Sequence, residues 1–490
     1  YAVVATGQVE VIGISNLSLS GLFTVRVNQF GDAIDQILPV TGTSETVVLD
    51  FSATETVSGT DEAFYEITAD DLTIEASEQN IMADLALRRV TLNRDGTTEN
   101  AFYFGLSDLS AVFSDGTNDI VSLTNASGDL LVFSDGIAAK FDGQLDVNVT
   151  DVKATGTYSL LLNTTGTAID QSFIVGENPQ LLQVEAGPFI RIVGNGVDLN
   201  ISDQTPTGQT LTGTFGFEQN AAGEVLVQLT DIRAAFSDGG TEVLVFENGN
   251  GALLLTAAGV AADLAGDLNI ALPDVSASGS FRFIINTTPN SVNRSIDLSG
   301  TSQTLNVGPG TFIQIVGRGV SLNVLGNELS GDLGFQQSAD GRVQGQINNA
   351  RLAFNNGTRD IIVLDNGNGA LAATSAGLAF EFGGDLTVDL PEVSVTGSFT
   401  VAANTSNAAV DETINFTGTP QTLFLPAGPY VRIAGNDVSL VIADQALSGN
   451  FIFERQNNGD ILIAASKVNL SVGEGIVSIS NGVGGLLIYN

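Results

Sequence analysis

Apolar and polar residues alternate along most of the chain, as in SFRFIIN (280–286), TFIQIVG (311–317) and DLTVDLP (385–391). These runs are rich in Val, Ile, Phe, Leu and Thr, and Gly, Asn or Asp interrupts them about every ten residues. Such alternation between turn-forming residues is typical of half-buried β-strands. Helical spacing is almost absent, and the one ambiguous segment, EASEQNIMADLALRR (75–89), has counterparts with strand character elsewhere in the chain. We therefore predict an all-β protein.

One frame, a Gly followed seven positions later by an Asn, recurs along the chain. Its four copies are Gly21–Asn28, Gly156–Asn163, Gly279–Asn286 and Gly397–Asn404. Other segments keep the same register: Phe113–Gly116, Phe236–Gly239 and Phe354–Gly357, and longer runs aligned on Phe189, Phe312 and Tyr430. We divide the chain into four repeats: 1–142 with an insertion near 40–62, 143–265, 266–383, and an incomplete 384–490. In tandem-repeat proteins each module buries its apolar face against its neighbours.

The two ends of the sequence supply neighbouring parts of one module. YAVVATGQVEV (1–11) resembles AGLAFEFGGDLTV (376–388), which comes directly after the part of the module where residue 490 lies. We expect either a window of a longer array or subunits that join at this point. An open strand edge is a template for pairing, so the expected partners are copies of the chain or adjoining repeats, head to tail.

Two β architectures fit this pattern. The first is an elongated continuous β array, solenoid-like or a wound sheet, because strand-like sequence runs through every repeat junction without a Pro-rich or charged linker. The second is a row of immunoglobulin-like β-sandwiches, since about 120 residues is also the size of such a domain. We favour the continuous form, since the Cys and Trp that mark immunoglobulin domains are both absent.

Composition limits the chemistry. Asp and Glu number 55 against 17 Lys and Arg, a formal charge of −38, which disfavours nucleic acid and anionic lipid as partners. The chain has no His and no Cys, which excludes Ser-His-Asp and Cys-His nucleophile systems, Cys/His zinc sites and disulfides. A glycosidase needs only two carboxylates in one cleft, but here the acidic residues are scattered over repeated loops. We predict no enzymatic activity, no required cofactor and no membrane-spanning helix, because no apolar stretch is long enough.

Calcium is the candidate ligand of the acidic turns. The loops after Phe113, Phe236 and Phe354 each place two oxygen donors four positions apart: Asp115 and Asp119, Asp238 and Glu242, Asn356 and Asp360. Calcium takes about six to eight oxygen atoms from carboxylates, amides and carbonyls. The alternative is that Asp-Gly and Asn-Gly are simply the residues preferred in tight hairpin turns, where φ is positive.

The Asn of the repeated frame starts an Asn-Thr-Thr or Asn-Thr-Ser triplet at Asn163, Asn286 and Asn404. These triplets are N-glycosylation sequons, and the alternative is an Asn that caps a strand or stacks on its copies. Two aromatic series also keep register: Phe23, Tyr158, Phe281 and Phe399, and Phe215, Phe335 and Phe451. We expect both series to be repeated core positions rather than a carbohydrate-stacking platform, for which Trp would be typical.

In composition and repetition the chain resembles the giant secreted tandem-repeat proteins of bacteria, the large adhesins and surface-fibre proteins. That resemblance covers the whole chain but rests on no diagnostic motif. It implies an extracellular or cell-surface location and a mechanical role. We expect a structural protein of an extracellular filament, sheath or matrix fibre. The alternatives are the stalk of a large adhesin and a polysaccharide-binding appendage that contacts glycans through the insertion near 40–62.

Overall fold

The computed structural model describes residues 1–10, 17–53, 55–56, 63–76, 79–94, 96–114, 119–149, 152–175, 178–201, 209–238, 241–473 and 476–489. These residues form 32 β-strands and no helix, so the described chain has no helix that could cross a membrane. The all-β prediction is confirmed, and the ambiguous segment 75–89 is divided between two strands. The chain separates into two compact units, and each is described by itself: unit 1 is 1–232, 254–256 and 296–302, and unit 2 is 233–253, 257–295 and 303–490.

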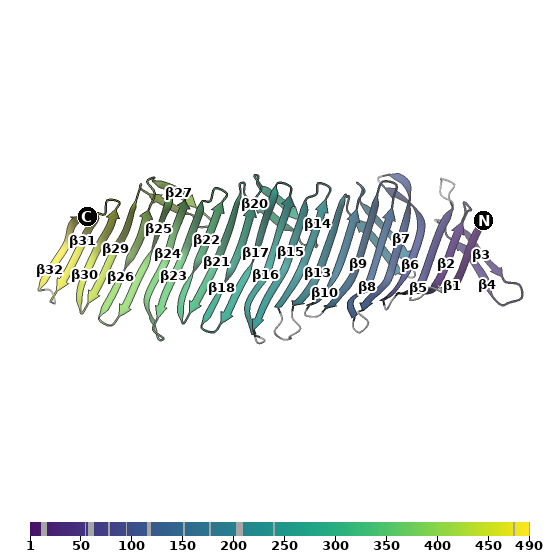
Figure 1. Cartoon of the computed structure of the whole chain (residues 1–490), viewed down its shortest axis with the longest axis horizontal. Helices are drawn as coiled ribbons and strands as arrows, with labels where there is room; N and C mark the ends of the chain where they lie inside the picture. Colours follow the sequence, from purple (N-terminus) through teal and green to yellow (C-terminus); the bar gives the residue numbers. More distant parts are fainter. Residues whose placement is uncertain are drawn as a thin grey trace. The chain divides into compact units, whose positions relative to one another are not determined.

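Unit 1 contains ten complete sheet strands and two small hairpins (Figure 1). The sheet strands are β1 (Ala2–Glu10), β2 (Leu17–Asn28), β5 (Phe64–Ala76), β6 (Gln79–Arg94), β7 (Thr97–Ser114), β8 (Asp119–Val132), β9 (Ile137–Val149), β10 (Val152–Asn163), β13 (Phe189–Ile201) and β14 (Gln209–Asn220). The hairpins are β3 (Ile34–Pro39) with β4 (Thr46–Phe51), and β11 (Ile169–Val175) with β12 (Asn178–Val184). Strand β15 (Val225–Asp238) is divided between the units, and unit 1 also holds the last three residues of β16 (Thr241–Thr256) and the last residue of β19 (Val292–Ile296).

Unit 2 repeats this plan. Its sheet strands are β16 (Thr241–Thr256), β17 (Gly259–Leu272), β18 (Val275–Asn286), β21 (Phe312–Val324), β22 (Asn327–Ser338), β23 (Val343–Asn355), β24 (Asp360–Thr374), β25 (Gly377–Leu390), β26 (Val393–Asn404), β29 (Tyr430–Ile442), β30 (Gln445–Gln456), β31 (Ile461–Val472) and β32 (Val477–Ile488). Two short pairs complete it: β19 (Val292–Ile296) with β20 (Gln303–Val307), and β27 (Val410–Ile414) with β28 (Gln421–Leu425).

Strand pairing assigns 24 strands to one antiparallel sheet and the other eight to four separate hairpins. Each hairpin follows a strand that ends in the Asn of the repeated frame (β2, β10, β18 or β26), and five further sheet strands precede the next such strand. The continuous form is therefore confirmed over a row of sandwiches, as a meander of antiparallel neighbours rather than coils. The predicted repeat boundaries lie inside β9, β17 and β25.

The Gly of the repeated frame lies at a β-bulge. The register of β26 against β29 shifts between Thr396 and Ser398, on either side of Gly397. A Cβ on Gly397 would lie 2.9 Å from the Cα of Val438, and Gly279 is equally crowded by Val320 on the next strand. A side chain at this position would push the neighbouring backbone away, so the bulge requires glycine.

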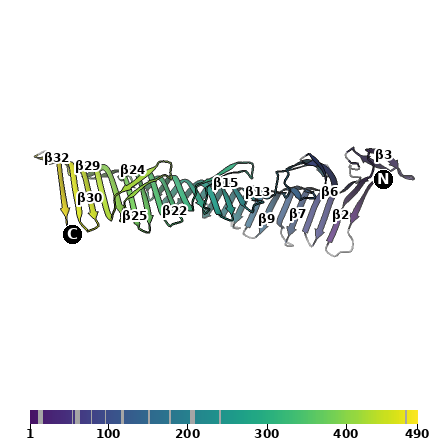
Figure 2. The same cartoon turned by 90° about the horizontal axis from the view of Figure 1, so that it is seen from above.

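The hairpins lie over one face of the sheet (Figure 2), and the hydrophobic core lies between them and that face. In unit 1 the hairpin side chains Phe173, Val175 and Leu182 are buried against Tyr103 and Leu131 of the sheet. In unit 2 the hairpin residues Ile414, Leu423 and Leu425 cover Ala370, Ala372, Ala379 and Ala402. The small alanine side chains allow the hairpin to approach the sheet closely, which keeps this thin core dense.

The two aromatic series lie elsewhere, so the prediction that they form the core is corrected. Phe399 and Phe451 line a hollow on the face away from the hairpins, and Phe335 is 46% exposed. The hairpins cover only one face, and side chains alternate between faces along a strand. A constant register in the sequence therefore identified one face of the sheet without identifying which face is covered.

Candidate functional site

The repeated asparagine is the most completely bonded side chain at the base of each hairpin. Asn163 is fully buried, and its amide nitrogen donates to the carbonyl oxygens of Thr167 (2.8 Å) and Glu185 (2.7 Å). Its amide oxygen accepts from the backbone N–H and the hydroxyl of Thr165, both at 2.8 Å. The side chain therefore joins both ends of the hairpin to the strand that precedes it.

The same bonds recur in unit 2. Asn286 donates to Asn290 and Gly308, and Asn404 donates to Ala408 and Pro426, at 2.7–2.9 Å. Each accepts from the residue two positions on, Thr288 or Ser406, through both backbone N–H and hydroxyl. The third position of the sequon is thus part of the same anchor, which accounts structurally for the Asn-x-Thr/Ser pattern.

The glycosylation prediction bears on these same three amides. In the folded protein each amide nitrogen is buried and already donates two hydrogen bonds. A glycan on that nitrogen would have to be attached before the hairpin closes, and it would prevent closure. Glycosylation at Asn163, Asn286 and Asn404 stays a prediction, and the observed role of these residues is that of an anchor.

A buried glutamine fixes the tip of two of the hairpins. Gln346 on β23 donates from its amide nitrogen to the carbonyl oxygen of Thr419 and accepts from the backbone N–H of Phe416 at 2.6 Å. Asn348, two residues along, donates to the Thr419 carbonyl oxygen at 3.0 Å. In unit 1, Gln228 makes the equivalent bonds to Thr301 and Leu298. Backbone groups of the hairpin turn are thereby satisfied in an otherwise apolar layer.

The hairpin β11–β12 of unit 1 uses aromatic chemistry instead. Gly105 occupies the position on β7 that Gln346 occupies on β23, and a Cβ there would collide with Val175 and Tyr103. The ring of Tyr103 stacks on that of Phe173, with centroids 3.8 Å apart. The guanidinium of Arg88 lies 5.1 Å from the Tyr103 ring centroid and donates to the carbonyl oxygen of Ile174.

Tyr103 and Asp129 form a buried polar pair beneath this hairpin. The Tyr103 hydroxyl donates to a carboxylate oxygen of Asp129 at 2.5 Å, and both residues are almost inaccessible to water. Burial raises the pKa of Asp129 above its usual range and outweighs the hydrogen bond from Tyr103, which favours the ionised form. Burial also raises the pKa of Tyr103, and the neighbouring carboxylate adds to that rise. Burial of an ionised Asp129 in this pair therefore costs folding free energy.

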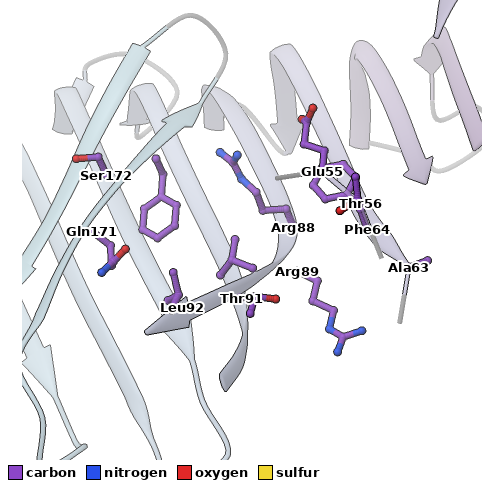
Figure 3. A pocket seen from close by; sticks show the side chains of 12 residues that line it. Glu55, Thr56, Ala63, Phe64, Arg88, Arg89, Thr91, Leu92, Gln171 and Ser172 are labelled. Atoms are coloured by element: carbon purple, nitrogen blue, oxygen red, sulfur yellow. The ribbon is translucent and has the colours of Figure 1, made fainter. Parts of the chain in front are cut away.

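A polar cavity of about 230 Å³ lies beside this pair in unit 1 (Figure 3). Figure 3 shows Arg88 and Arg89 extending from the same strand in different directions. Glu66 approaches Arg88 Nε at 3.6 Å, and Glu55 pairs with Arg26 at 2.5 Å. The cavity is lined by Glu55, Thr56, Ala63, Phe64, Arg88, Arg89, Val90, Thr91, Leu92, Gln171, Ser172 and Phe173. Its two guanidinium groups provide positive charge in an acidic protein.

The predicted calcium residues lie at the ends of strands, and several already have partners. Glu242 accepts two hydrogen bonds from Arg233, at 2.6 and 2.7 Å. Asp360 accepts from Arg351 (2.7 Å) and Asn355 (3.1 Å), which lower its pKa, with Asn355 the larger cause. Asn356 folds over its own turn and accepts from the backbone N–H groups of Thr358 and Arg359, each at 3.1 Å.

The remaining members of the calcium prediction are less defined. Asp119 is exposed at the start of β8, Asp115 lies outside the described residues, and the side chain of Asp238 is likewise not described. Among the described residues, no group of three or more acidic side chains is placed to hold a metal ion. Calcium binding stays a prediction for the turns, where the ion would compete with arginine for the carboxylates.

Sequence reasoning found the anchor asparagine by its spacing but assigned it no partner. It missed Gln228, Gln346, Asn348 and the Tyr103–Asp129 pair, because these positions differ between repeats and carry no motif. One available signal was that Gln228 and Gln346 are polar but uncharged. An alternating strand nevertheless predicts a polar residue to be exposed, so a buried amide has the same pattern as a surface position. No family model matches this sequence, and the search of curated proteins finds no match.

Proposed function

We propose that this protein is a structural component of an extracellular filament, sheath or matrix fibre. The observation that carries the proposal is the recurrence of one hairpin-on-sheet module with a buried asparagine at its base. Asn163, Asn286 and Asn404 make the same four hydrogen bonds, and Asn28 makes three, because residue 30 has no hydroxyl. The bonds serve the fold itself, as expected of a protein whose work is mechanical. Net charge of −38 keeps such fibres soluble and apart.

The proposed partners are further modules of the same kind, in copies of the chain or adjoining repeats. The first hairpin supports this. Leu38 on β3 is 47% exposed, whereas Phe173 at the equivalent position on β11 is 7% exposed. Val40 and Val175 differ in the same way, at 39% and 0%. The first hairpin thus presents apolar side chains that suit the alanine-lined sheet face found beneath its counterparts, and pairing of sheet edges would bring such a face beneath it.

Electron microscopy of the native material tests the proposal. We expect continuous filaments much longer than one chain. Lateral association should strengthen with salt, because repulsion between acidic surfaces is screened within about 8 Å at physiological ionic strength. Isolated single-chain rods attached to a cell through another domain would overturn the fibre role in favour of an adhesin stalk. Enrichment on a polysaccharide matrix without filaments would favour a glycan-binding appendage.

A further inference from the structure

The face of unit 2 that carries no hairpin is apolar. Its side chains alternate along each strand with those that face β27–β28: on β29, Tyr430 is buried, whereas Val431 is 45% exposed. We call this surface the bare face and define it by six large side chains, each 36–52% exposed: Ile313, Ile315, Phe335, Val431, Ile433 and Phe453. They come from β21, β22, β29 and β30, so the bare face extends over successive repeats.

The bare face has relief as well as hydrophobicity. A hollow of about 220 Å³ lies over Gly345 and Gly369, between the rings of Phe335 and Phe382. A second hollow of about 320 Å³ lies over Gly435, beside Phe399 and Phe453. In both places a phenylalanine ring of the neighbouring strand leans over a glycine: a Cβ on Gly369 would lie 2.9 Å from the ring of Phe382, and a Cβ on Gly435 would lie 3.1 Å from the ring of Phe399.

Most of the charged side chains on these strands lie on the opposite face. Arg432, between Val431 and Ile433 in sequence, pairs with Glu454 at 2.7 Å on the hairpin side. Glu454 itself follows Phe453, so a charged and an apolar residue alternate across the sheet on both strands. On the hairpin side of β25, Asp385 accepts from Ser398 and Asn366. The hairpin side of these strands is therefore charged, whereas the bare face is mainly apolar and carries Arg455 at its edge, opposite Val431.

A sheet with an exposed apolar face ordinarily buries that face against a second layer. The six side chains together expose on the order of 500 Å². With the half-buried rings around the two hollows, the bare face reaches roughly the 800 Å² per partner that a specific interface needs. A second copy fits it best, because it carries the same large apolar side chains at the same positions of the two repeats: Ile313 and Val431, Ile315 and Ile433, and Phe335 and Phe453.

We propose that the bare face of unit 2 packs against the same face of a second copy of this chain, giving a two-layered sheet. Sheets packed face to face lie about 10 Å apart with strands within about 30° of each other, so the large apolar side chains of one copy would interdigitate with those of the other. The contact is isologous, as in most soluble dimers. The inference rests on the proposed structural role and names the lateral partner of the filament.

Sedimentation of the full chain tests this proposal with a matched pair of variants. Phe335→Lys places a charge in the bare face, and Thr387→Lys places the same charge at an exposed position on the hairpin side of β25. We expect concentration-dependent dimers for the parent chain and for Thr387→Lys. Phe335→Lys should dissociate at least tenfold more readily, since an unpaired charge would be buried in the contact. Equal behaviour of the two variants, or a parent chain that stays monomeric, would overturn the proposal.

A second measurement remains decisive if Phe335→Lys fails to fold, as circular dichroism would show. The chain has no cysteine, so Ile433→Cys and Thr387→Cys are single reporters. On raising the protein concentration, maleimide labelling of Ile433→Cys should slow at least tenfold, while labelling of Thr387→Cys stays constant. A lipid surface is the alternative partner of the bare face, and flotation with neutral phosphatidylcholine vesicles tests it. A chain that stays monomeric, floats with the vesicles and has its Ile433→Cys thiol protected from maleimide by lipid alone would overturn the proposal.

The outcome is separable from that of the proposed function. Filaments with the mass per length of a single sheet would leave the structural role standing and remove the lateral pairing. Paired chains that never form filaments would support the pairing and remove the fibre role.

Discussion

The hairpins β11–β12 and β27–β28 are copies of one element held to the sheet by different chemistry. Both depend on the same anchor, Asn163 in unit 1 and Asn404 in unit 2, with closely similar distances. At the tip, β27–β28 is held by hydrogen bonds from Gln346, whereas β11–β12 rests on the stacked rings of Tyr103 and Phe173. The base of the hairpin is therefore fixed by backbone geometry, and the tip is free to vary.

This difference follows from what each position must satisfy. At the base, the chain leaves the sheet and returns, and the exposed carbonyl and N–H groups of the two crossings need partners in the same places in every copy. An asparagine side chain offers two donors and an acceptor in one plane, which suits this task. At the tip, any set of side chains suffices that packs densely beneath the hairpin and satisfies its own polar groups. The buried amide and the stacked aromatic rings both meet this requirement.

Removal of the anchor should have the largest effect. Asn404→Leu leaves the carbonyl oxygen of Pro426 and the N–H of Ser406 without their partner, and leaves the carbonyl oxygen of Ala408 with the Ser406 hydroxyl alone, at a cost of about 3–5 kcal/mol. We expect hydrogen exchange of β27–β28 to quicken by more than about 100-fold, since each 1.4 kcal/mol is tenfold. Exchange of β11–β12 in the same molecule is the control, and Asn163→Leu should give the reverse pattern. Unchanged exchange in the affected hairpin would contradict the anchor role.

Substitution of each tip residue by its counterpart from the other hairpin tests whether the amide and the aromatic arrangements are interchangeable. Gln346→Gly removes the acceptor for Phe416 N–H and one of the two donors to the Thr419 carbonyl oxygen, the other being Asn348, which should cost about 2–3 kcal/mol. Gly105→Gln inserts a side chain against Val175 and Tyr103, and overpacking of this kind costs about 1–3 kcal/mol. Hydrogen exchange of each hairpin measures both. If Gly105→Gln stabilised β11–β12, the two tips would be interchangeable and the comparison would fail.

The Tyr103–Asp129 pair makes the stability of the β11–β12 hairpin depend on pH, whereas the tip of β27–β28 is held by the uncharged side chain of Gln346. The pKa of Asp129 is raised on folding, so the folded protein takes up a proton there before the unfolded chain does. The contribution of Asp129 to stability therefore rises as the pH falls from 7 toward the ordinary carboxyl value of about 3.9. Asp129→Asn keeps an acceptor for the Tyr103 hydroxyl and should be more stable than the parent at pH 7, with a gap that narrows on acidification.

Thermal unfolding of parent and Asp129→Asn at pH 7 and 4.5 measures this gap. Asp267→Asn is the matched control, because hydrogen bonds from Ser280 and Asn248 lower the pKa of that exposed carboxyl. Its contribution is lost only as the pH falls below the ordinary value. A gap between parent and Asp129→Asn that widens toward pH 4.5 would mean that Asp129 is stabilised in its ionised form.

Much of the fold could be predicted from the sequence, because its strongest signals are local. Alternation gave strands, and the uninterrupted strand pattern at repeat junctions indicated a continuous sheet. The hairpin could not be recognised: segments such as IDQSFIV (169–175) alternate like any strand. The anchor was found as a spacing, but its partners lie up to 22 residues away on a crossing chain. Which face of the sheet is covered depends on where the hairpins fold, and alternation is symmetric between faces.

The smallest effect expected concerns calcium at the third acidic turn. Arg351 and Asn355 already satisfy Asp360, and an ion would have to displace the guanidinium. We expect Arg351→Gln to strengthen calcium binding, measured by titration calorimetry at low salt, from a weak parent affinity of about 10⁻⁴–10⁻³ M. Arg359→Gln is the control, because it removes the same charge from the same turn but frees Asp389 instead of Asp360. Binding heat in none of the three proteins would leave the turn as a hairpin connection whose acidic residue serves arginine alone.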